Sequence, residues 1–270
     1  MLKLIVSALQ EDGYNHDVTT MNLVDKSIML SGNFVAKANG IVSGVDVAEA
    51  VFKYINPKIK FTIHKPNGSY VNRGSSIATI SGPMRDILRG ERIALNFMQR
   101  MSGIATVTNQ FVQEVKGTNA LILDTRKTTP GFRAFEKYSV KVGGGALHRF
   151  NLSDCAMIKD NHIQVAGSVT NAVKLVKANL SHAHKIELEC DTLEQIKEAL
   201  PLGVDIIMLD NMTLEQMKEA VELINHRATV EASGNVHLDT VRKIAECGVD
   251  IISSSAIVAK APTLDVALDM

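Results

Sequence analysis

The chain has 270 residues, of which 46% are hydrophobic, and its 29 Lys and Arg residues balance its 29 Asp and Glu residues. This length and composition predict a folded protein with one large or two modest domains, and they exclude an intrinsically disordered chain. Because the chain is neutral overall, it has no global electrostatic reason to bind nucleic acid or a membrane surface. Any site for an anion must therefore be local.

The cysteines and the apolar segments limit the protein class further. Cys155, Cys190 and Cys247 are far apart and form no CxxC pair, which excludes zinc-ligand spacing and suits a reducing compartment. No apolar run approaches the ~18 residues that span a bilayer. The first ten residues lack the basic segment and cleavage site of a signal peptide. We therefore expect a cytoplasmic protein with no membrane partner and no nucleic-acid partner.

The first 115 residues predict a mixed α/β domain. A helix is expected over 2–9, and β-strands over 31–38, 58–64 and 76–81, the last two separated by turn-forming clusters. From 85 to 115, apolar residues recur at three- and four-residue spacing, which is typical of helices. Ser102-Gly103 is expected to separate two helices there. We place the N-terminal domain at 1–115 and expect 258–270 to rejoin it.

The second half predicts a βα barrel over 116–257. Short apolar runs predict strands at 121–123, 156–158, 186–188, 206–209, 229–230 and 249–252. Amphipathic segments between the later runs predict helices, among them 193–200, 214–224 and 238–247. Repeated βα units imply a parallel sheet, and a ring of them implies a barrel. With six strands in place of eight, the barrel is expected to be open.

Polar side chains follow every predicted barrel strand. They are Asp124 to Lys127, Lys159-Asp160, Glu189, Asp210-Asn211, Ser233 to Asn235 and Ser253 to Ser255. Active sites of βα barrels lie at the carboxyl ends of the strands. Six polar strand ends in succession therefore predict a site at that end of the barrel.

The chemistry of these strand ends indicates a polyanionic ligand. The segment from Asp124 to Asn161 holds seven Lys and Arg residues against four acids, a net charge of +3 in a neutral chain. Glu189 and Asp210 follow successive strands and suit either a magnesium ion or sugar hydroxyls. The small hydroxyl and amide groups of Ser233-Gly234-Asn235, before a predicted helix N-terminus, suit a phosphate, and Ser253-Ser254-Ser255 on the next strand could complete that site. The sequence leaves the role of His148 open among an acid, a base and a charge partner.

Ten contiguous residues, Asp124 to Arg133, match the signature of the quinolinate phosphoribosyltransferase family without interruption. Further matching blocks are Asp17–Thr20, Gly90–Arg92, Leu95–Phe97, Ser102–Thr106, Glu136–Tyr138, Val142–Gly145, His148-Arg149, Ile158–His162, Met208–Asn211 and Glu231–Asn235. The likeness runs in the same order from about residue 11 to the C-terminus. The chain therefore resembles this family over nearly its whole length.

The resemblance implies a fold and a reaction. The fold is an α/β protein with an N-terminal α/β sandwich domain and a C-terminal open βα barrel. The reaction transfers phosphoribosyl from phosphoribosyl pyrophosphate to quinolinate with loss of CO2, giving nicotinate mononucleotide for NAD biosynthesis. It also implies a homodimer, or a hexamer built as a trimer of dimers, with sites shared between subunits and Arg92 reaching into the partner's barrel.

The resemblance also assigns the site residues. The implied substrate-binding residues are Arg92, Thr125, Arg126, Lys127, His148, Arg149, Lys159, Ser233, Gly234, Asn235, Ser253, Ser254 and Ser255. The implied catalytic residues are Lys127, Lys159, Glu189 and Asp210, of which Glu189 and Asp210 also bind Mg²⁺. Quinolinate carries two adjacent carboxylates, and the cations outnumber what one carboxylate requires.

Three other functions remain open from the sequence. One is a related phosphoribosyltransferase that acts on another pyridine acid or aromatic anion. Another is a carrier or binding module, because 66–82 faintly resembles biotinyl and lipoyl domains, although it lacks an obvious lysine at a hairpin tip. The last is a barrel that binds phosphorylated ligands without turnover.

Overall fold

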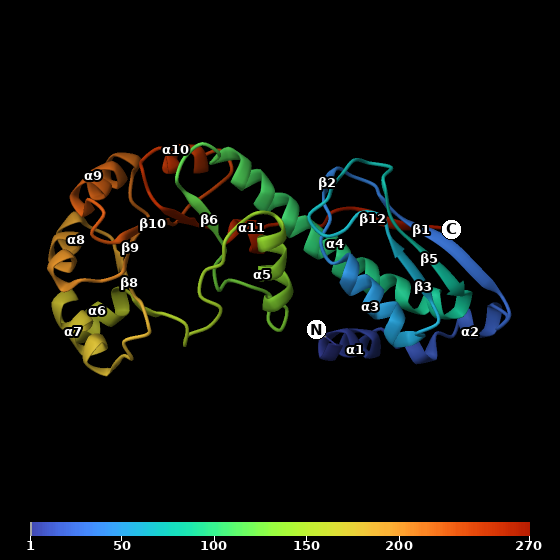
Figure 1. The fold of residues 1–270 in the computed structure, drawn as a ribbon. Helices are drawn as coiled ribbons and strands as arrows, with labels where there is room; N and C mark the ends of the chain where they lie inside the picture. The colour runs from blue at the N-terminus through green and yellow to red at the C-terminus, as the bar shows by residue number, and fades with distance from the viewer. Residues whose placement is uncertain (1) are drawn as a thin grey trace. The chain divides into compact units, whose positions relative to one another are not determined.

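The computed structural model describes residues 2–270, which pack into two compact units. The first unit contains residues up to 109, together with 129–144 and 261–270, and the second contains 110–128 and 145–260. The expected domains differ from these units chiefly at 129–144, which the chain order alone would place with the barrel. Each unit has its own sheet and its own helices (Figure 1).

The first unit contains a four-stranded antiparallel sheet with the order β12-β1-β5-β3. Its strands are β1 (Met29–Ala36), β3 (Lys60–Ile63), β5 (Ser76–Pro83) and β12 (Val266–Asp269), and β2 (Gly40–Ile41) pairs separately with β4 (Tyr70–Val71). β12 pairs with β1 through Phe34 and Leu268, so the C-terminal residues return to the first unit.

Helices pack on this sheet around one apolar core. They are α1 (Leu2–Glu11), α2 (Thr20–Leu23), α3 (Val45–Ile55), most of α4 (Met84–Glu114) and α5 (Arg133–Val142), with a 3-10 turn η1 (Tyr14–His16) after α1. Three aromatic rings from β1, α3 and β3 meet in the core: Phe34 lies 5.9 Å from Phe52 and 5.5 Å from Phe61 between ring centroids. Such pairs add to the free energy gained by burying the rings.

Helix α4 is continuous, so the expected break at Ser102-Gly103 is wrong. Gly103 serves a close approach, since a Cβ there would overlap the Pro262 carbonyl oxygen. The buried Ser102 hydroxyl accepts the Ser43 backbone N–H at 2.9 Å and donates to the Ser43 carbonyl oxygen at 3.0 Å. The same serine and glycine are compatible with a helix break and with a continuous helix. Only the packing around them in the folded protein explains their presence.

The second unit is built on six parallel strands in the order β6-β11-β10-β9-β8-β7, which confirms the predicted open βα barrel. The strands are β6 (Leu121–Leu123), β7 (Ala156–Ile158), β8 (Ile186–Cys190), β9 (Ile206–Asp210), β10 (Thr229–Ser233) and β11 (Ile251–Ser253). β6 and β7 form the two edges of this sheet. All six strands present their carboxyl ends on the same side.

Helices follow the strands along the outer side of this sheet (Figure 1). They are α6 (Asp160–Ala166), α7 (Val169–Asn179), α8 (Leu193–Ala199), the 3-10 turn η2 (Leu200–Leu202), α9 (Leu214–Ile224), α10 (Val241–Ala245) and α11 (Ala256–Ala259). Hydroxyl N-caps start three of them, at Ser168, Thr192 and Thr213. The helix expected from Leu238 begins only at Val241, because the Thr240 side chain closes a turn onto His237.

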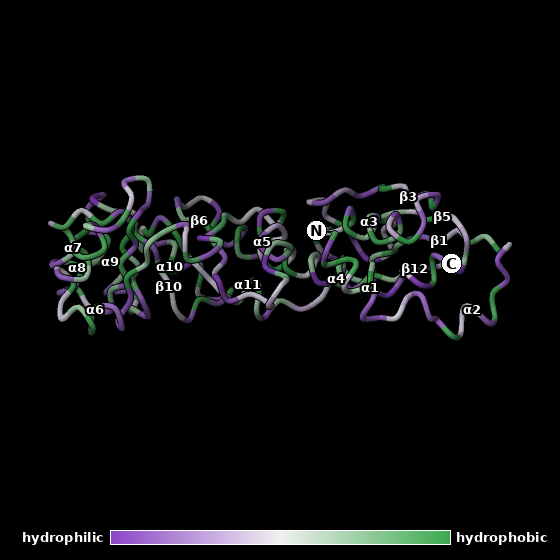
Figure 2. Tube along the Cα trace, turned by 90° about the horizontal axis from the view of Figure 1, so that it is seen from below, coloured by the Kyte–Doolittle hydropathy of each residue, from purple (hydrophilic) through white to green (hydrophobic). Residues whose placement is uncertain are grey.

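Hydrophobic and hydrophilic residues alternate over short distances along the trace (Figure 2). Within residues 2–270, no helix is both long enough and apolar enough to cross a membrane. The apolar residues instead form the faces that the helices and strands bury against one another.

Candidate functional site

Two cavities lie at the carboxyl ends of the barrel strands, as the polar strand ends predict. The larger has a volume of about 600 Å³ and contains the ends of β7, β8, β9 and β10 in its lining. The smaller has a volume of about 200 Å³ and lies at the ends of β10 and β11. Thr125, Lys127, Ser233 and Ser253 line both, so the two cavities are adjoining parts of one site.

The structure brings together all but one of the residues assigned from the resemblance. The larger cavity is lined by Thr125, Arg126, Lys127, His148, Arg149, Lys159, Glu189, Asp210, Ser233, Gly234, Asn235 and Ser253, and the smaller one adds Ser254 and Ser255. Arg92 belongs to α4 in the first unit, where it is exposed. Its expected role in a partner's site stays a prediction.

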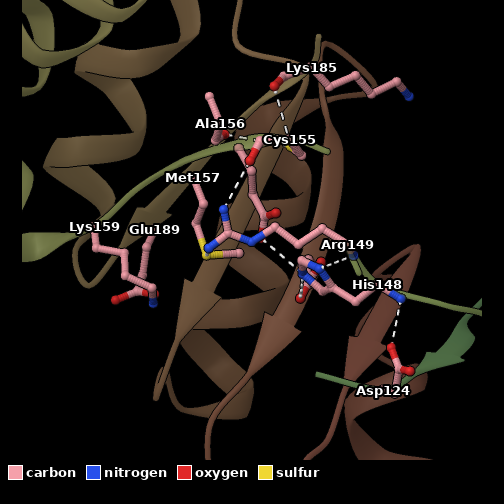
Figure 3. Close-up of polar contacts among 11 residues, drawn as sticks. Asp124, His148, Arg149, Cys155, Ala156, Met157, Lys159, Lys185 and Glu189 are labelled. Atoms are coloured by element: carbon pink, nitrogen blue, oxygen red, sulfur yellow. Dashed lines mark hydrogen bonds and ion pairs between the residues drawn. The ribbon is translucent and has the colours of Figure 1, made fainter. Parts of the chain in front are cut away.

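Four cations and two carboxylates line the larger cavity, which favours an anionic ligand. Two protein groups hold the Arg149 guanidinium (Figure 3). Its Nη1 atom donates to the Cys155 carbonyl oxygen at 2.9 Å, and its Nη2 atom lies 3.3 Å from the Met157 Sδ atom. An arginine has five N–H donors, so this arrangement leaves others for a carboxylate in the cavity.

The two acids at the rim come from neighbouring parallel strands. Glu189 lies on β8 opposite Met208, two residues before Asp210 on β9. Glu189 forms an ion pair with Lys159, and Asp210 accepts a hydrogen bond of 2.8 Å from the Asn211 side chain. Carboxylate oxygens that face one cavity are the hard ligands that Mg²⁺ prefers, so these residues fit a magnesium ion held jointly with a ligand's oxygens.

The smaller cavity has the character of a phosphate site. Its lining contains the loop 233–237, which begins Ser-Gly-Asn, and the loop 253–256 with three serines, together with Lys127 and Lys260. The first loop is tight: Gly234 has a φ of +91°, and a Cβ there would overlap the Asn211 side chain. Because α10 begins only at Val241, the helix N-terminus expected after Asn235 is not part of this loop. Hydroxyls, backbone groups and lysines therefore define the site.

Below the larger cavity, His148 contacts two glutamates inside the barrel. The imidazole Nε2 lies 3.5 Å from Glu187 Oε1 and 3.4 Å from Glu231 Oε1. Burial alone lowers the pKa of His148, but the two glutamate carboxylates beside Nε2 outweigh it and raise the pKa to about 9. Burial raises the pKa of the Glu187 carboxyl, and the neighbouring His148 imidazole opposes that rise.

Several of these residues are not predicted by the sequence. Glu187 and Glu231 carried one available signal, because each is an acid inside an apolar strand, where charged side chains are rarely buried without a partner. Asn211 was noted as a strand-end residue but not assigned to the site. Lys260 directly follows helix α11, and no motif in the residues around it indicates a role in binding.

Two family models match nearly the whole chain. Residues 17–102 match the family described as quinolinate phosphoribosyl transferase, N-terminal domain, and residues 104–269 match its C-terminal domain. The carrier interpretation of 66–82 therefore has no support, since that segment lies within the N-terminal domain match.

Curated relatives agree with these matches. The chain is 44% identical over 240 residues to a probable carboxylating nicotinate-nucleotide pyrophosphorylase of Synechocystis, covering 88% of this chain and 81% of the relative. It is 37% identical over 277 residues to a probable enzyme of the same name from Methanothermobacter thermautotrophicus, covering 100% of this chain and 99% of the relative.

Solved structures of similar proteins have the same fold. NadC of Streptococcus pyogenes is 38% identical, with a TM-score of 0.96 over 99% of this chain and 95% of that one. The nicotinate-nucleotide pyrophosphorylase of Ehrlichia chaffeensis is 40% identical, with a TM-score of 0.96 over 100% of this chain and 98% of that one. Human nicotinic acid phosphoribosyltransferase, at 12% identity and a TM-score of 0.67, shares the fold alone.

Proposed function

The chain belongs to the quinolinate phosphoribosyltransferase family, and we propose on this basis that it makes nicotinate mononucleotide for NAD biosynthesis. It joins quinolinate to the phosphoribosyl group of phosphoribosyl pyrophosphate and releases pyrophosphate and CO2. The observation that carries the substrate assignment is the pair of adjoining cavities, in which four cations line the larger and the loops 233–237 and 253–256 line the smaller. Such a pair of cavities suits a dicarboxylate beside a phosphorylated sugar.

Quinolinate fits the basic side of the cavity. Arg126, Arg149 and Lys159 line it, and two adjacent carboxylates need more than one fixed cation. Arginine binds a carboxylate through two parallel N–H groups, which orients the pyridine ring as well as holding it. Orientation matters because the ring nitrogen must face the ribose carbon at the moment of transfer.

Phosphoribosyl pyrophosphate fits the remaining side. The 5-phosphate would occupy the smaller cavity, between Ser233–Asn235 and Ser253–Ser255. Glu189 and Asp210 would bind the ribose and pyrophosphate side together with Mg²⁺, while Lys127 adds a positive charge where both cavities meet. When bound, Mg²⁺ would offset the negative charge on the leaving pyrophosphate.

The reaction then needs alignment more than a nucleophile from the protein. The bond from the ribose carbon to pyrophosphate lengthens, that carbon gains oxocarbenium character, and the quinolinate nitrogen attacks it. The nitrogen becomes a positively charged pyridinium. Its charge stabilises the carbanion left at C2 when CO2 departs, and a proton then replaces the lost carboxylate. The side chains of Lys127 and Lys159 offset the negative charges around these steps.

Assembly and location complete the proposal. We expect a homodimer, or a trimer of dimers, in which Arg92 from one subunit completes the partner's quinolinate site. A cytoplasmic location suits Cys155, Cys190 and Cys247, which are all free thiols, because thiols stay reduced there.

A direct assay tests the function. The purified protein should release pyrophosphate and CO2 in equal amounts from quinolinate, phosphoribosyl pyrophosphate and Mg²⁺. Nicotinate in place of quinolinate tests the related phosphoribosyltransferases. Product with nicotinate and none with quinolinate would overturn the proposal, and binding without either product would favour a non-catalytic barrel.

A further inference from the structure

Two buried carboxylates lie in the barrel one layer below the substrate cavity. Glu187 precedes Glu189 on β8 by two residues, and Glu231 precedes Ser233 on β10 by two, so both point to the barrel interior. Each residue is 1% exposed. Layers inside βα barrels are normally filled by branched apolar side chains, and a buried carboxylate is costly unless something pairs with it.

The His148 imidazole supplies that pairing. Within residues 2–270, both oxygens of Glu187 and Oε1 of Glu231 are buried and have no partner at hydrogen-bond distance and geometry. The Nε2 atom of His148 lies between the two carboxylates, 3.4 and 3.5 Å from the nearest oxygen of each. The positive charge of Arg149 also acts on Glu187. The imidazole N–H is thus the donor group placed between both acids.

The opposite side of the same ring contacts the main chain of the substrate loop. Nδ1 accepts the backbone N–H of Arg149 at 2.7 Å, and the backbone N–H of His148 donates to Asp124 Oδ1 at 2.8 Å (Figure 3). Both ring nitrogens therefore face protein groups. In this arrangement, the ring lines the cavity without presenting a nitrogen to a ligand.

A metal ion is the competing occupant of this cluster. One ligand atom each from His148, Glu187 and Glu231 lies within 4.8 Å of the others, which is compact enough for a cation. A metal would need Nε2 without its proton. While Nδ1 accepts the Arg149 N–H, a neutral ring must carry its proton on Nε2. A charged ring carries a proton there as well, so Nε2 acts as a donor in either state.

We propose that Glu187 and Glu231 are positioning residues for quinolinate: they hold the His148 ring at its Nε2–H group, and His148 directly precedes Arg149 and so sets the position of the Arg149 backbone. The contacts of the Arg149 guanidinium with Cys155 and Met157 fix its orientation. The guanidinium then meets the substrate carboxylate at a defined angle. His148 is thus also a positioning residue, because it acts on quinolinate through Arg149. This inference rests on the proposed function, because it assigns Arg149 to quinolinate.

The first experiment replaces each glutamate in two ways. Glu187→Gln and Glu231→Gln keep the size and an acceptor oxygen, whereas Glu187→Leu and Glu231→Leu remove the acceptor. Glu198→Leu is the control for the loss of a structural glutamate, because Glu198 lies on the outer helix α8, where it accepts two hydrogen bonds of 2.7 Å. The leucine variants should raise the KM for quinolinate about tenfold, which corresponds to about 1.4 kcal/mol.

The pattern of kinetic constants separates positioning from general damage. The KM for phosphoribosyl pyrophosphate should stay within about twofold of the wild type, and the glutamine variants should retain part of the quinolinate affinity. An equal rise in both KM values, or unchanged quinolinate KM in all four variants, would overturn the proposal. If the leucine variants do not fold, the glutamine variants and the NMR measurement described next still test the proposal.

NMR of protein labelled with ¹⁵N-histidine observes the proposed contact without activity. The wild type should show one Nε2-bound proton protected from exchange with water, identified by its loss in His148→Gln. The Glu187→Gln/Glu231→Gln double variant should lose that protection. A stoichiometric divalent metal in the purified wild type that the double variant lacks would instead show a metal centre. Wild-type protein with the protected proton but no quinolinate turnover would refute the proposed function alone.

Discussion

Lys159 and Glu189 form an ion pair across the carboxyl ends of the neighbouring strands β7 and β8. The parallel register places Ile158 opposite Leu188, so the two charged residues that follow them emerge side by side. Lys159 is assigned to quinolinate and Glu189 to the magnesium side. The pair therefore lies where the two substrates must meet.

The metal assignment predicts a shifted magnesium requirement in Asp210→Asn. An amide is a weaker ligand for Mg²⁺ than a carboxylate, so half-maximal activity should need about tenfold more Mg²⁺. Initial rates over a magnesium titration at saturating substrates measure this. Glu194→Gln, which changes an acid in the first turn of α8, is the control and should match the wild type. An unchanged requirement in Asp210→Asn would remove Asp210 from the metal site.

The assignment of Arg149 predicts a large loss of quinolinate affinity in Arg149→Ala. Loss of a bidentate contact to a buried carboxylate should weaken binding by about 2–3 kcal/mol, or roughly 30- to 150-fold. Titration of quinolinate into the protein measures the affinity, and circular dichroism checks the fold. Arg73→Ala, at an exposed loop of the first unit, is the control. A wild-type affinity in Arg149→Ala would refute the carboxylate role.

The shared-site proposal predicts complementation between two inactive variants. Arg92→Ala and Lys127→Ala should each have little activity, because each lacks a cation of the quinolinate site. Mixed dimers should contain one site with both defects and one with neither, and should therefore regain up to about half the wild-type activity per dimer. Heterodimers can be purified with two different affinity tags. If purified heterodimers stay inactive, Arg92 does not reach the partner's site.

The pKa of His148 predicts how stability depends on pH. A pKa raised from 6.5 to about 9 means that the folded protein favours the imidazolium. The resulting stabilisation is fully present below about pH 6.5 and is lost as the pH rises through about 9. The difference in free energy of unfolding between the wild type and His148→Gln should therefore shrink over that range. Urea denaturation of both proteins from pH 6 to pH 9.5 measures it.

A constant difference over that range would instead indicate a neutral ring throughout. That result would favour the hydrogen bond from the Arg149 backbone to Nδ1 over protonation of that nitrogen, since the two compete. The Nε2 proton would remain between the glutamates in that case as well.

The sequence by itself determined the barrel and predicted most of the residues that line the cavities at its strand ends. Short apolar runs at regular spacing predict six parallel strands, and the polar residues after each run meet because parallel strands end on one side. The contiguous signature from Asp124 to Arg133 and the further matching blocks named the family, which the matches over 17–102 and 104–269 confirm. These features are local in the chain, so they can be recognised without the fold.

Only the tertiary structure decided which distant residues support that site. His148, Glu187 and Glu231 come from a loop and two strands, and no spacing in the chain relates them. The glycine at 103, inside the continuous helix α4, is likewise explained only by the close approach of Pro262. In both places, the physical reason is a contact between side chains or backbone far apart in sequence, which local periodicity and propensity do not contain.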